Sequence, residues 1–369
     1  MTSSKWLAVI VSAAILVVGI AACGSSDDET AGGNSGSSSE VSGEIAGAGS
    51  TAQQAAQEAW LAEFENQNSG VTISYDPVGS GGGREQFIAG GTAFAGSDAA
   101  LSTEEDELSK AEKRCAPGQL IEVPNYISPI AIIYNLPGVE ELQLDPETLA
   151  KIFNQEIDSW DDPAIAADNP GAELPDTRIT PVNRSDESGT TENFTEYLSE
   201  VVPSIWSYEV SGDWPVKGGE AASGTSGVVE AVAAGEGAIG YADASQAGEL
   251  GIAKVKVGKE YAEPTPEAAA KVLEESPLDK ELSPGKYTIA YKLNRKTESE
   301  GTYPIVLTSY LIACTKYDSA DEAAAVKAYL EYVISPEGQE LAAEQAGSAP
   351  LSSALTSKVT PAIEAIEAG

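Results

Sequence analysis

The strongest constraint on the fold is a recurring order of elements, in which a strand runs into a loop of Gly, Ser and Thr residues and a helix follows. Residues 47–51 precede a predicted helix over 52–64, residues 79–83 precede one over 84–89, and residues 184–190 precede one that contains Phe194. Alternating strands and helices predict an α/β fold with largely parallel sheets. The length of 369 residues exceeds one typical core and predicts two domains of roughly 150 residues each.

Apolar periodicity gives the same assignment. Residues 71–75 alternate as a half-buried strand does, and the apolar runs 130–134 and 305–313 are typical of strands covered on both faces. Pro336 is a stop signal for the last of three predicted helices. The apolar stripes of these helices are Ala52, Ala56, Trp60 and Phe64; Phe194, Tyr197, Leu198 and Val201; and Val326, Tyr329, Leu330 and Val333.

The three loops have a chemistry that suits an anion. A helix N-terminus offers unpaired N–H groups and a positive partial charge. Glycine lets the backbone approach a ligand closely, and Ser and Thr hydroxyls add donors. One such loop is more often a plain helix cap, but three in one chain favour an oxyanion pocket. Arg184, in the third loop, is the only positive charge that we expect at this pocket.

Composition excludes several classes of function. The chain has no histidine, which rules out Ser-His-Asp and Cys-His catalysis and histidine metal sites. Its 58 acidic and 21 basic residues give a net charge of −37, which argues against nucleic-acid partners and against a basic lipid-binding patch. The acidic runs 103–107 and 158–162 are interpreted as solvated faces or helix caps, and we expect no metal or other cofactor.

The N-terminus has the pattern of an export signal. In residues 1–22, Lys5 precedes an apolar segment over 6–20, which is shorter than the roughly 20 residues of a membrane span. The segment ends before Cys23 in a sequence that resembles a bacterial lipobox, so we expect Cys23 to carry lipid; the alternative is an ordinary signal peptide. Residues 23–43 are rich in Gly, Ser, Asp and Glu and predict a flexible tether.

Two further cysteines, Cys115 and Cys314, remain in the exported chain. An even pair in an exported protein is a disulfide candidate, and two buried free thiols are the alternative.

At its loops the chain resembles the PstS family, the phosphate-binding lipoproteins of the bacterial ABC-type phosphate importer. The matching segments keep the family's order from about residue 44 to residue 314, so the set is far more specific than any one motif. The matches are residues 47–51 (GAGST), 79–82 (GSGG), 94–99 (FAGSDA), 160–165 (WDDPAI), 184–190 (RSDESGT), 237–241 (GAIGY) and 303–305 (YPI).

The resemblance implies a set of phosphate ligands drawn from these loops. It also implies that Asp98 accepts a hydrogen bond from a protonated phosphate oxygen and that Asp186 orients Arg184. Two residues depart from the family: Ala52 replaces a common aromatic residue, and Glu187 replaces a common glycine and is expected to face solvent. The implied ligands are Thr51, the Ala52 amide, Ser80, Asp98, Arg184, Ser188, Gly189 and Thr190.

The family fold implies a two-lobed, periplasmic-binding-protein-like architecture of type II, with the ligand cleft between two α/β lobes joined by two crossovers. Lobe 1 would comprise residues 44–126 and 304–369, and lobe 2 residues 127–303. An anion that touches loops of both lobes would favour the closed state.

The resemblance implies a receptor, not an enzyme. It would be lipid-anchored on the outer face of the cell membrane, with a monomeric body that delivers inorganic phosphate to membrane permease and ATPase subunits. The alternatives are a receptor for sulfate or molybdate and a phosphate sensor without a transport role. A hydrolase that uses Ser188 or Ser80 is disfavoured, because the chain has no histidine and no metal motif.

Overall fold

A computed structural model describes residues 41–103 and 106–369 of the chain. The predicted signal peptide, Cys23 and most of the predicted tether lie outside the described residues. Strand β1 (Gly43–Gly49) begins at the last residue of that tether, and the Gly43 amide already donates to the Gly70 carbonyl at 3.0 Å. No helix within residues 41–103 and 106–369 has the length and apolar character needed to cross a membrane.

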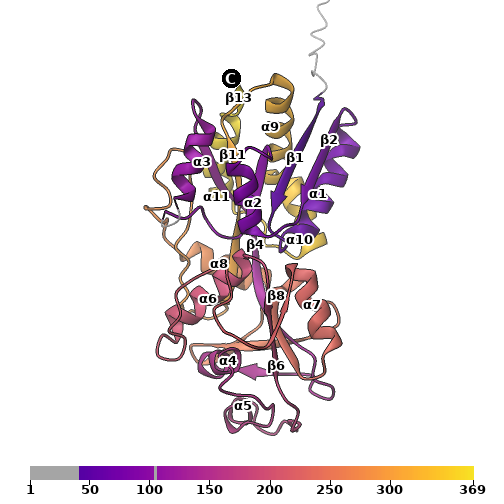
Figure 1. Cartoon of the computed structure of the whole chain (residues 1–369), viewed down its shortest axis with the longest axis vertical. Coiled ribbons are helices and arrows are strands. Elements are labelled where there is room, and N and C mark those ends of the chain that lie inside the picture. The colour runs from indigo at the N-terminus through magenta and orange to yellow at the C-terminus, as the bar shows by residue number, and fades with distance from the viewer. Residues whose placement is uncertain (1–40, 104–105) are drawn as a thin grey trace, which may run out of the picture. The chain divides into compact units, whose positions relative to one another are not determined.

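Eleven strands of the described chain form one curled sheet (Figure 1). The path runs β2-β1-β3-β11-β4-β8-β6-β7, and β9, which pairs with β4, carries β5 and β10. The remaining bounds are β2 Val71–Asp76, β3 Phe94–Ser97, β4 Leu120–Tyr134, β5 Gln143–Leu144, β6 Thr180–Arg184, β7 Glu220–Ala222, β8 Ala238–Asp243, β9 Gly251–Val257, β10 Glu260–Ala262 and β11 Val306–Cys314, with β12 Lys316–Tyr317 and β13 Glu367–Ala368 as a separate pair.

The prediction of largely parallel sheets is wrong. The flanking pairs β1–β2, β1–β3, β6–β7 and β6–β8 are parallel, but β11 runs antiparallel to both β3 and β4, and β4 runs antiparallel to β8. The reason is that the chain runs in one direction along β4 and returns in the opposite direction along β11, which lies beside it. The α/β class is nevertheless confirmed, because helices alternate with the strands.

Strand β4 pairs with different strands along its length. Its residues from Leu120 to Pro129 pair with β11, and those from Ile130 to Tyr134 pair with β8. In Figure 1 it runs from the group that contains β1, β2 and β11 toward the group that contains β6 and β8. Tyr126, the predicted crossover, lies within β4, and its hydroxyl donates to buried Asp243 at 3.1 Å.

The three helices predicted from apolar stripes are confirmed as α1, α6 and α9. Pro336 does more than stop a helix: α9 ends at Ile334, and Pro336 is the first residue of α10, whose N-cap is Ser335. The helices are α1 Gln54–Gln67, α2 Ser80–Ile88, α3 Glu107–Cys115, α4 Pro146–Phe153, α5 Pro163–Asp168, α6 Gly189–Val201, α7 Gly224–Ala234, α8 Pro266–Glu274, α9 Ala320–Ile334, α10 Pro336–Ala346 and α11 Ser353–Glu364, with a 3₁₀ turn at Ala244–Gln246.

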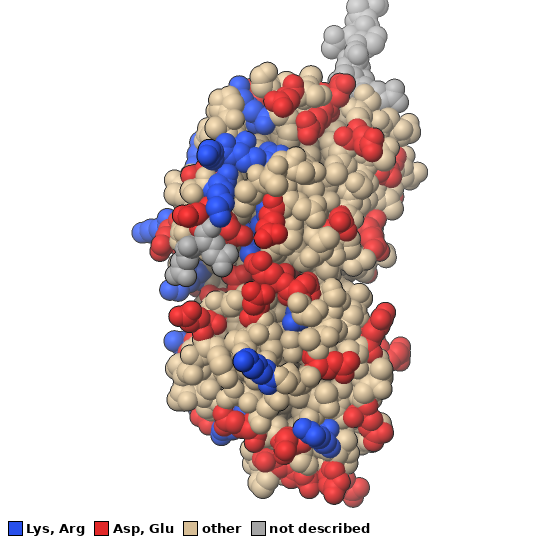
Figure 2. Space-filling model, in the orientation of Figure 1, with Lys and Arg blue, Asp and Glu red and all other residues tan. Residues whose placement is uncertain are grey.

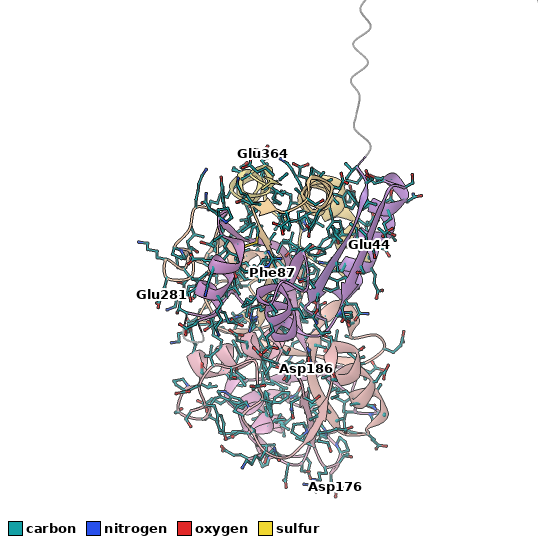
Figure 3. All side chains as sticks on the ribbon, turned by 45° about the horizontal axis from the view of Figure 1, so that its top comes forward. Glu44, Phe87, Asp176, Asp186, Glu281 and Glu364 are labelled. Atoms are coloured by element: carbon teal, nitrogen blue, oxygen red, sulfur yellow. A yellow bond between two sulfur atoms is a disulfide. The ribbon has the colours of Figure 1, made fainter. Side chains whose placement is uncertain are left out.

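The helices cover the sheet with apolar side chains. Phe87 of α2 is fully buried, and Figure 3 shows it inside the molecule while Glu44, Glu281 and Glu364 lie at the periphery. Cys115, at the end of α3, forms a disulfide with Cys314, at the end of β11, with an S–S distance of 2.00 Å. The pair therefore joins a helix to the sheet across 199 residues of sequence.

Helix α2 begins at Ser80, four residues before the predicted start, so the glycines after Ser80 are helical. Gly79, with φ +92°, makes the turn from β2 into the helix. The following glycines allow close packing: a Cβ on Gly83 would lie 2.8 Å from the Ala48 carbonyl oxygen. These glycines therefore bring the start of α2 against the end of β1.

Candidate functional site

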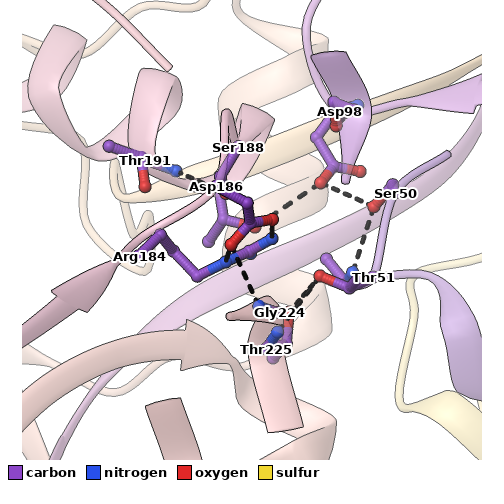
Figure 4. Close-up of polar contacts among 12 residues, drawn as sticks. Ser50, Thr51, Asp98, Arg184, Asp186, Ser188, Thr191, Gly224 and Thr225 are labelled. Carbon is purple, nitrogen blue, oxygen red and sulfur yellow. Dashed lines mark hydrogen bonds and ion pairs between the residues drawn. The ribbon is translucent and has the colours of Figure 1, made fainter. Parts of the chain in front are cut away.

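Four helix N-termini face one another at the ends of the strands. They belong to α1, α2, α6 and α7. Figure 4 shows labelled residues from the loops before α1, α6 and α7 around a common region, together with Asp98. The start of α2 joins them because the Asp98 amide donates to Ser80 Oγ at 3.0 Å. Each N-terminus contributes backbone donors and a positive partial charge. The three loops identified in the sequence are thus brought together, and a fourth joins them.

The first loop follows β1 and is held by Ser50. Its hydroxyl accepts from the amides of Ala52 at 3.0 Å and Gln53 at 3.4 Å, and it donates to Asp98 Oδ2 at 2.7 Å. Thr51 Oγ1 lies 2.9 Å from Thr225 Oγ1 and accepts from the Thr225 amide at 3.1 Å. Thr51 therefore connects the start of α1 with the start of α7.

Asp98 is a buried carboxylate directly after β3, with an exposed fraction of 2%. Its Oδ1 accepts from Ser309 Oγ at 2.5 Å, its Oδ2 lies 3.5 Å from Thr190 Oγ1, and its amide donates to Ser80 Oγ at 3.0 Å. Burial raises the pKa of Asp98, while hydrogen bonds from Ser309 and Ser50 and the charge of Arg184 oppose that shift. The carboxylate is thus held in place by hydroxyl donors.

The third loop begins with a buried arginine at the end of β6. Arg184 Nε donates to Asp186 Oδ1 at 2.8 Å, and its Nη2 pairs with Asp186 Oδ2. Asp186 Oδ1 also accepts from the amide of Gly224 at 3.0 Å. Burial alone would raise the pKa of Asp186, but the hydrogen bond and charge of Arg184 lower it overall. Asp186 thus fixes the Arg184 guanidinium, as the resemblance implied.

Helix α6 starts with the other predicted ligands. Ser188 is its N-cap and accepts from the Thr191 amide at 3.2 Å. Gly189 packs so closely that an added Cβ would lie 2.7 Å from both Asp98 Cβ and Ser80 Oγ. Asn193, one turn further on, donates to the Asp98 carbonyl at 2.7 Å. The N-termini of α2 and α6 are therefore in direct contact.

Sequence reasoning missed Thr225 and the N-terminus of α7. Residues 223–227 read SGTSG before a helix, which is the same design as the three loops that were found. The strand before it, β7, has only three residues and no apolar alternation, so the strand signal was absent. A search for Gly/Ser/Thr runs before any helix would have found this loop.

Arg84 is a second cation that was not expected, with an exposed fraction of 3%. It donates from Nε to Glu107 Oε1 at 2.9 Å and from Nη2 to Glu187 Oε1 at 2.7 Å. The expectation that Glu187 simply faces solvent is therefore wrong, since its carboxylate is bound to Arg84. From the sequence, residues 103–107 are interpreted as a solvated face or a helix cap. Glu107 is the first residue of α3 and accepts from the Ser102 amide at 3.0 Å, but it is buried and not solvated, since its charge compensates that of Arg84.

Acidic side chains outnumber basic ones over the face shown in Figure 2, where the clearest basic group lies over α3. The electrostatic field of the whole protein therefore repels anions, so an anion bound where the helix N-termini meet must be held by nearby hydrogen-bond donors. No group of three or more Cys, Asp or Glu residues in the described part of the chain is arranged to hold a metal ion.

Comparisons with known proteins agree on one family. The model of the PBP superfamily domain matches residues 34–337. The chain is 35% identical over 357 residues to phosphate-binding protein PstS2 of Mycobacterium bovis (strain BCG / Pasteur 1173P2), covering 94% of this chain and 95% of the relative. It is 36% identical over 326 residues to phosphate-binding protein PstS 3 of Mycobacterium leprae, covering 86% and 85%.

Solved structures share the fold. The high affinity periplasmic phosphate-binding protein PfluDING, bound with phosphate, superposes with a TM-score of 0.72 at 24% identity, covering 86% of this chain and 93% of that one. A putative phosphate ABC transporter substrate-binding protein from Clostridium perfringens, with bound phosphate, gives a TM-score of 0.58 at 19% identity, covering 84% and 100%. The two-lobed binding-protein fold expected from the sequence is thereby confirmed.

Proposed function

The chain belongs to the PstS family of phosphate-binding proteins within the PBP superfamily, and we propose on that premise that it captures inorganic phosphate outside the cytoplasm and delivers it to an ABC-type importer. It is a binding protein and not an enzyme. The observation that carries the proposal is the meeting of four helix N-termini around one buried Arg184 and several hydroxyls. Such a set of donors suits a tetrahedral oxyanion.

The donors come from both proposed lobes. We place residues 44–126 and 304–369 in lobe 1 and residues 127–303 in lobe 2. Phosphate would then be held between them and would favour their closure, with Asp98 accepting a hydrogen bond from a protonated phosphate oxygen. The proposed ligands are Thr51, the Ala52 amide, Ser80 and Asp98 from lobe 1, and Arg184, Ser188, Gly189 and Thr190 from lobe 2.

Titration calorimetry of the purified wild-type protein tests this function. We expect one phosphate per chain, competition by arsenate, and no measurable heat from sulfate, because sulfate brings no proton for Asp98. Equal binding of sulfate would instead favour the alternative of a general oxyanion receptor. Absence of phosphate binding under all buffer conditions would contradict the proposed function.

We further propose that Cys23 carries lipid and that the body works as a monomer tethered to the outer face of the membrane, beside the permease and ATPase subunits that it serves. Cys23→Ala is expected to move the protein out of the membrane fraction or to leave it unprocessed, since the thioether that holds the lipid cannot form. Fractionation and labelling with a fatty-acid analogue check this. A wild-type protein that takes up no label would refute the anchor.

A further inference from the structure

The ion pair between Arg84 and Glu187 joins the two sides of the site, because Arg84 lies in α2 and Glu187 lies in the loop that leads into α6. We propose that Glu187 is a positioning residue that holds the phosphate site closed by pairing with Arg84. The inference rests on the proposed function and adds to it a residue that sets how fast the bound anion leaves.

Arg84 is organised for this contact by its own side of the site. Glu107 Oε1 accepts from its Nε at 2.9 Å, and Ser97 Oγ accepts from its Nη1 at 3.1 Å. Both partners come from the same group of elements as α2, so they hold the guanidinium whether or not the site is closed. Its Nη2 is then directed at Glu187 at 2.7 Å. A preorganised arginine loses little freedom when a carboxylate arrives.

The start of α2 is shaped to receive Glu187. A Cβ on Gly81 would lie 2.8 Å from Glu187 Oε1 and nearer still to its other carboxylate atoms. A Cβ on Gly79 would lie 2.8 Å from the Glu187 carbonyl oxygen and 2.7 Å from Asp186 Oδ2. A side chain at position 79 would push the loop away, and one at position 81 would displace the Glu187 carboxylate from α2, so the two glycines make the close contact possible.

Glu187 is also coupled to the ligands by its place in the chain. It stands between Asp186, which fixes Arg184, and Ser188, which caps α6. A loop that moves toward α2 therefore carries the ligands and the carboxylate together, and phosphate and the ion pair stabilise the same closed arrangement. The Glu187 side chain is 36% exposed and Arg84 only 4%, so added salt weakens the pair without abolishing it.

Electrostatic repulsion alone would give Glu187 the opposite effect on phosphate release. A carboxylate beside an anion site repels the anion, so its removal should tighten binding. The pairing with Arg84 predicts that its removal loosens the closed state and speeds release. The sign of the change in release rate therefore separates a positioning role from mere repulsion.

The test is stopped-flow release of phosphate from full-length wild-type protein, Glu187→Gln and the control Glu85→Gln. Glu85 is exposed on the same helix, so its variant changes the net charge equally without touching the ion pair. We expect Glu187→Gln to release phosphate at least fivefold faster, with association within twofold of wild type and an unchanged thermal midpoint in the absence of phosphate. Glu85→Gln should release at the wild-type rate.

Salt gives a second readout: raising ionic strength should speed release from wild type and from Glu85→Gln, but far less from Glu187→Gln. If Glu187→Gln does not fold, Glu187→Ala serves with the same expected result. Release from the Glu187 variants that is unchanged or slower would overturn the proposal while wild-type phosphate binding stands. Failure of the wild type to bind phosphate would instead overturn the proposed function.

Discussion

Arg184→Ala is expected to weaken phosphate binding by at least tenfold. Arg184 is buried, and Asp186 fixes it through both Nε and Nη2. A charge-assisted hydrogen bond in a desolvated cleft contributes roughly 1.5–3 kcal/mol, against about 1 kcal/mol for a neutral one. The truncation also leaves the Asp186 carboxylate without its cation, beside an anion that it would then repel. Both effects act against binding.

Calorimetry of Arg184→Ala and Ser188→Ala under the same conditions checks this expectation. Ser188 contributes a neutral hydroxyl that also caps α6, so its loss should cost less affinity and about 1 kcal/mol of stability. Thermal unfolding of both variants without phosphate separates loss of affinity from loss of fold. Small and equal effects from the two variants would show that the third loop does not hold the anion.

Much of this architecture could be predicted because local signals were strong. Strands followed by Gly/Ser/Thr loops marked three helix N-termini, and the apolar stripes located α1, α6 and α9. The sequence contained no comparable signal for the relative direction of the strands. Whether β11 lies parallel or antiparallel to β4 depends on how the chain returns from a distant segment, and residues 306–314 contain nothing that specifies it.

Dependence on residues distant in the sequence also explains why the ion pairs of Arg84 were not predicted. Arg84 follows a glycine run in the first turns of a helix, and an arginine side chain in a helix is usually exposed to solvent. Its burial depends on Glu107, 23 residues away, and on Glu187, 103 residues away. Nothing in the sequence next to Glu107 or Glu187 identifies either residue as a partner of a buried arginine. The departure of Glu187 from the family's glycine was visible in the sequence, but its cause appears only when α2 and α6 lie together.

Asp98→Asn is expected to narrow the preference for phosphate over sulfate by at least tenfold. A carboxylate among anion ligands is costly unless the ligand donates a hydrogen bond to it, because like charges repel strongly in a low-dielectric pocket. Monobasic and dibasic phosphate carry such a proton near neutral pH and sulfate does not. A bound sulfate would leave the carboxylate charged and facing a like charge, whereas asparagine can also donate.

The contacts of Asp98 support its proposed role as an acceptor. Ser50 and Ser309 each donate to one of its oxygens, at 2.7 and 2.5 Å, which stabilises the carboxylate form. It also lies across from Thr190 at the start of α6, which places it where the four N-termini meet. Hydroxyl groups, and no arginine or helix-terminal amide, contact the Asp98 carboxylate within the described residues, as expected for an acceptor and not for a helix cap or a structural ion pair.

We propose that Asp98 selects phosphate by accepting a hydrogen bond from a protonated oxygen of the ligand. The most direct measurement is the ratio of sulfate to phosphate dissociation constants, determined by calorimetry at one pH and ionic strength for wild type and Asp98→Asn. We expect the wild type to reject sulfate strongly and the ratio to be at least tenfold smaller in the variant, with the unliganded thermal midpoint confirming that the variant is folded. The same ratio in the two proteins would show that Asp98 does not discriminate between the anions.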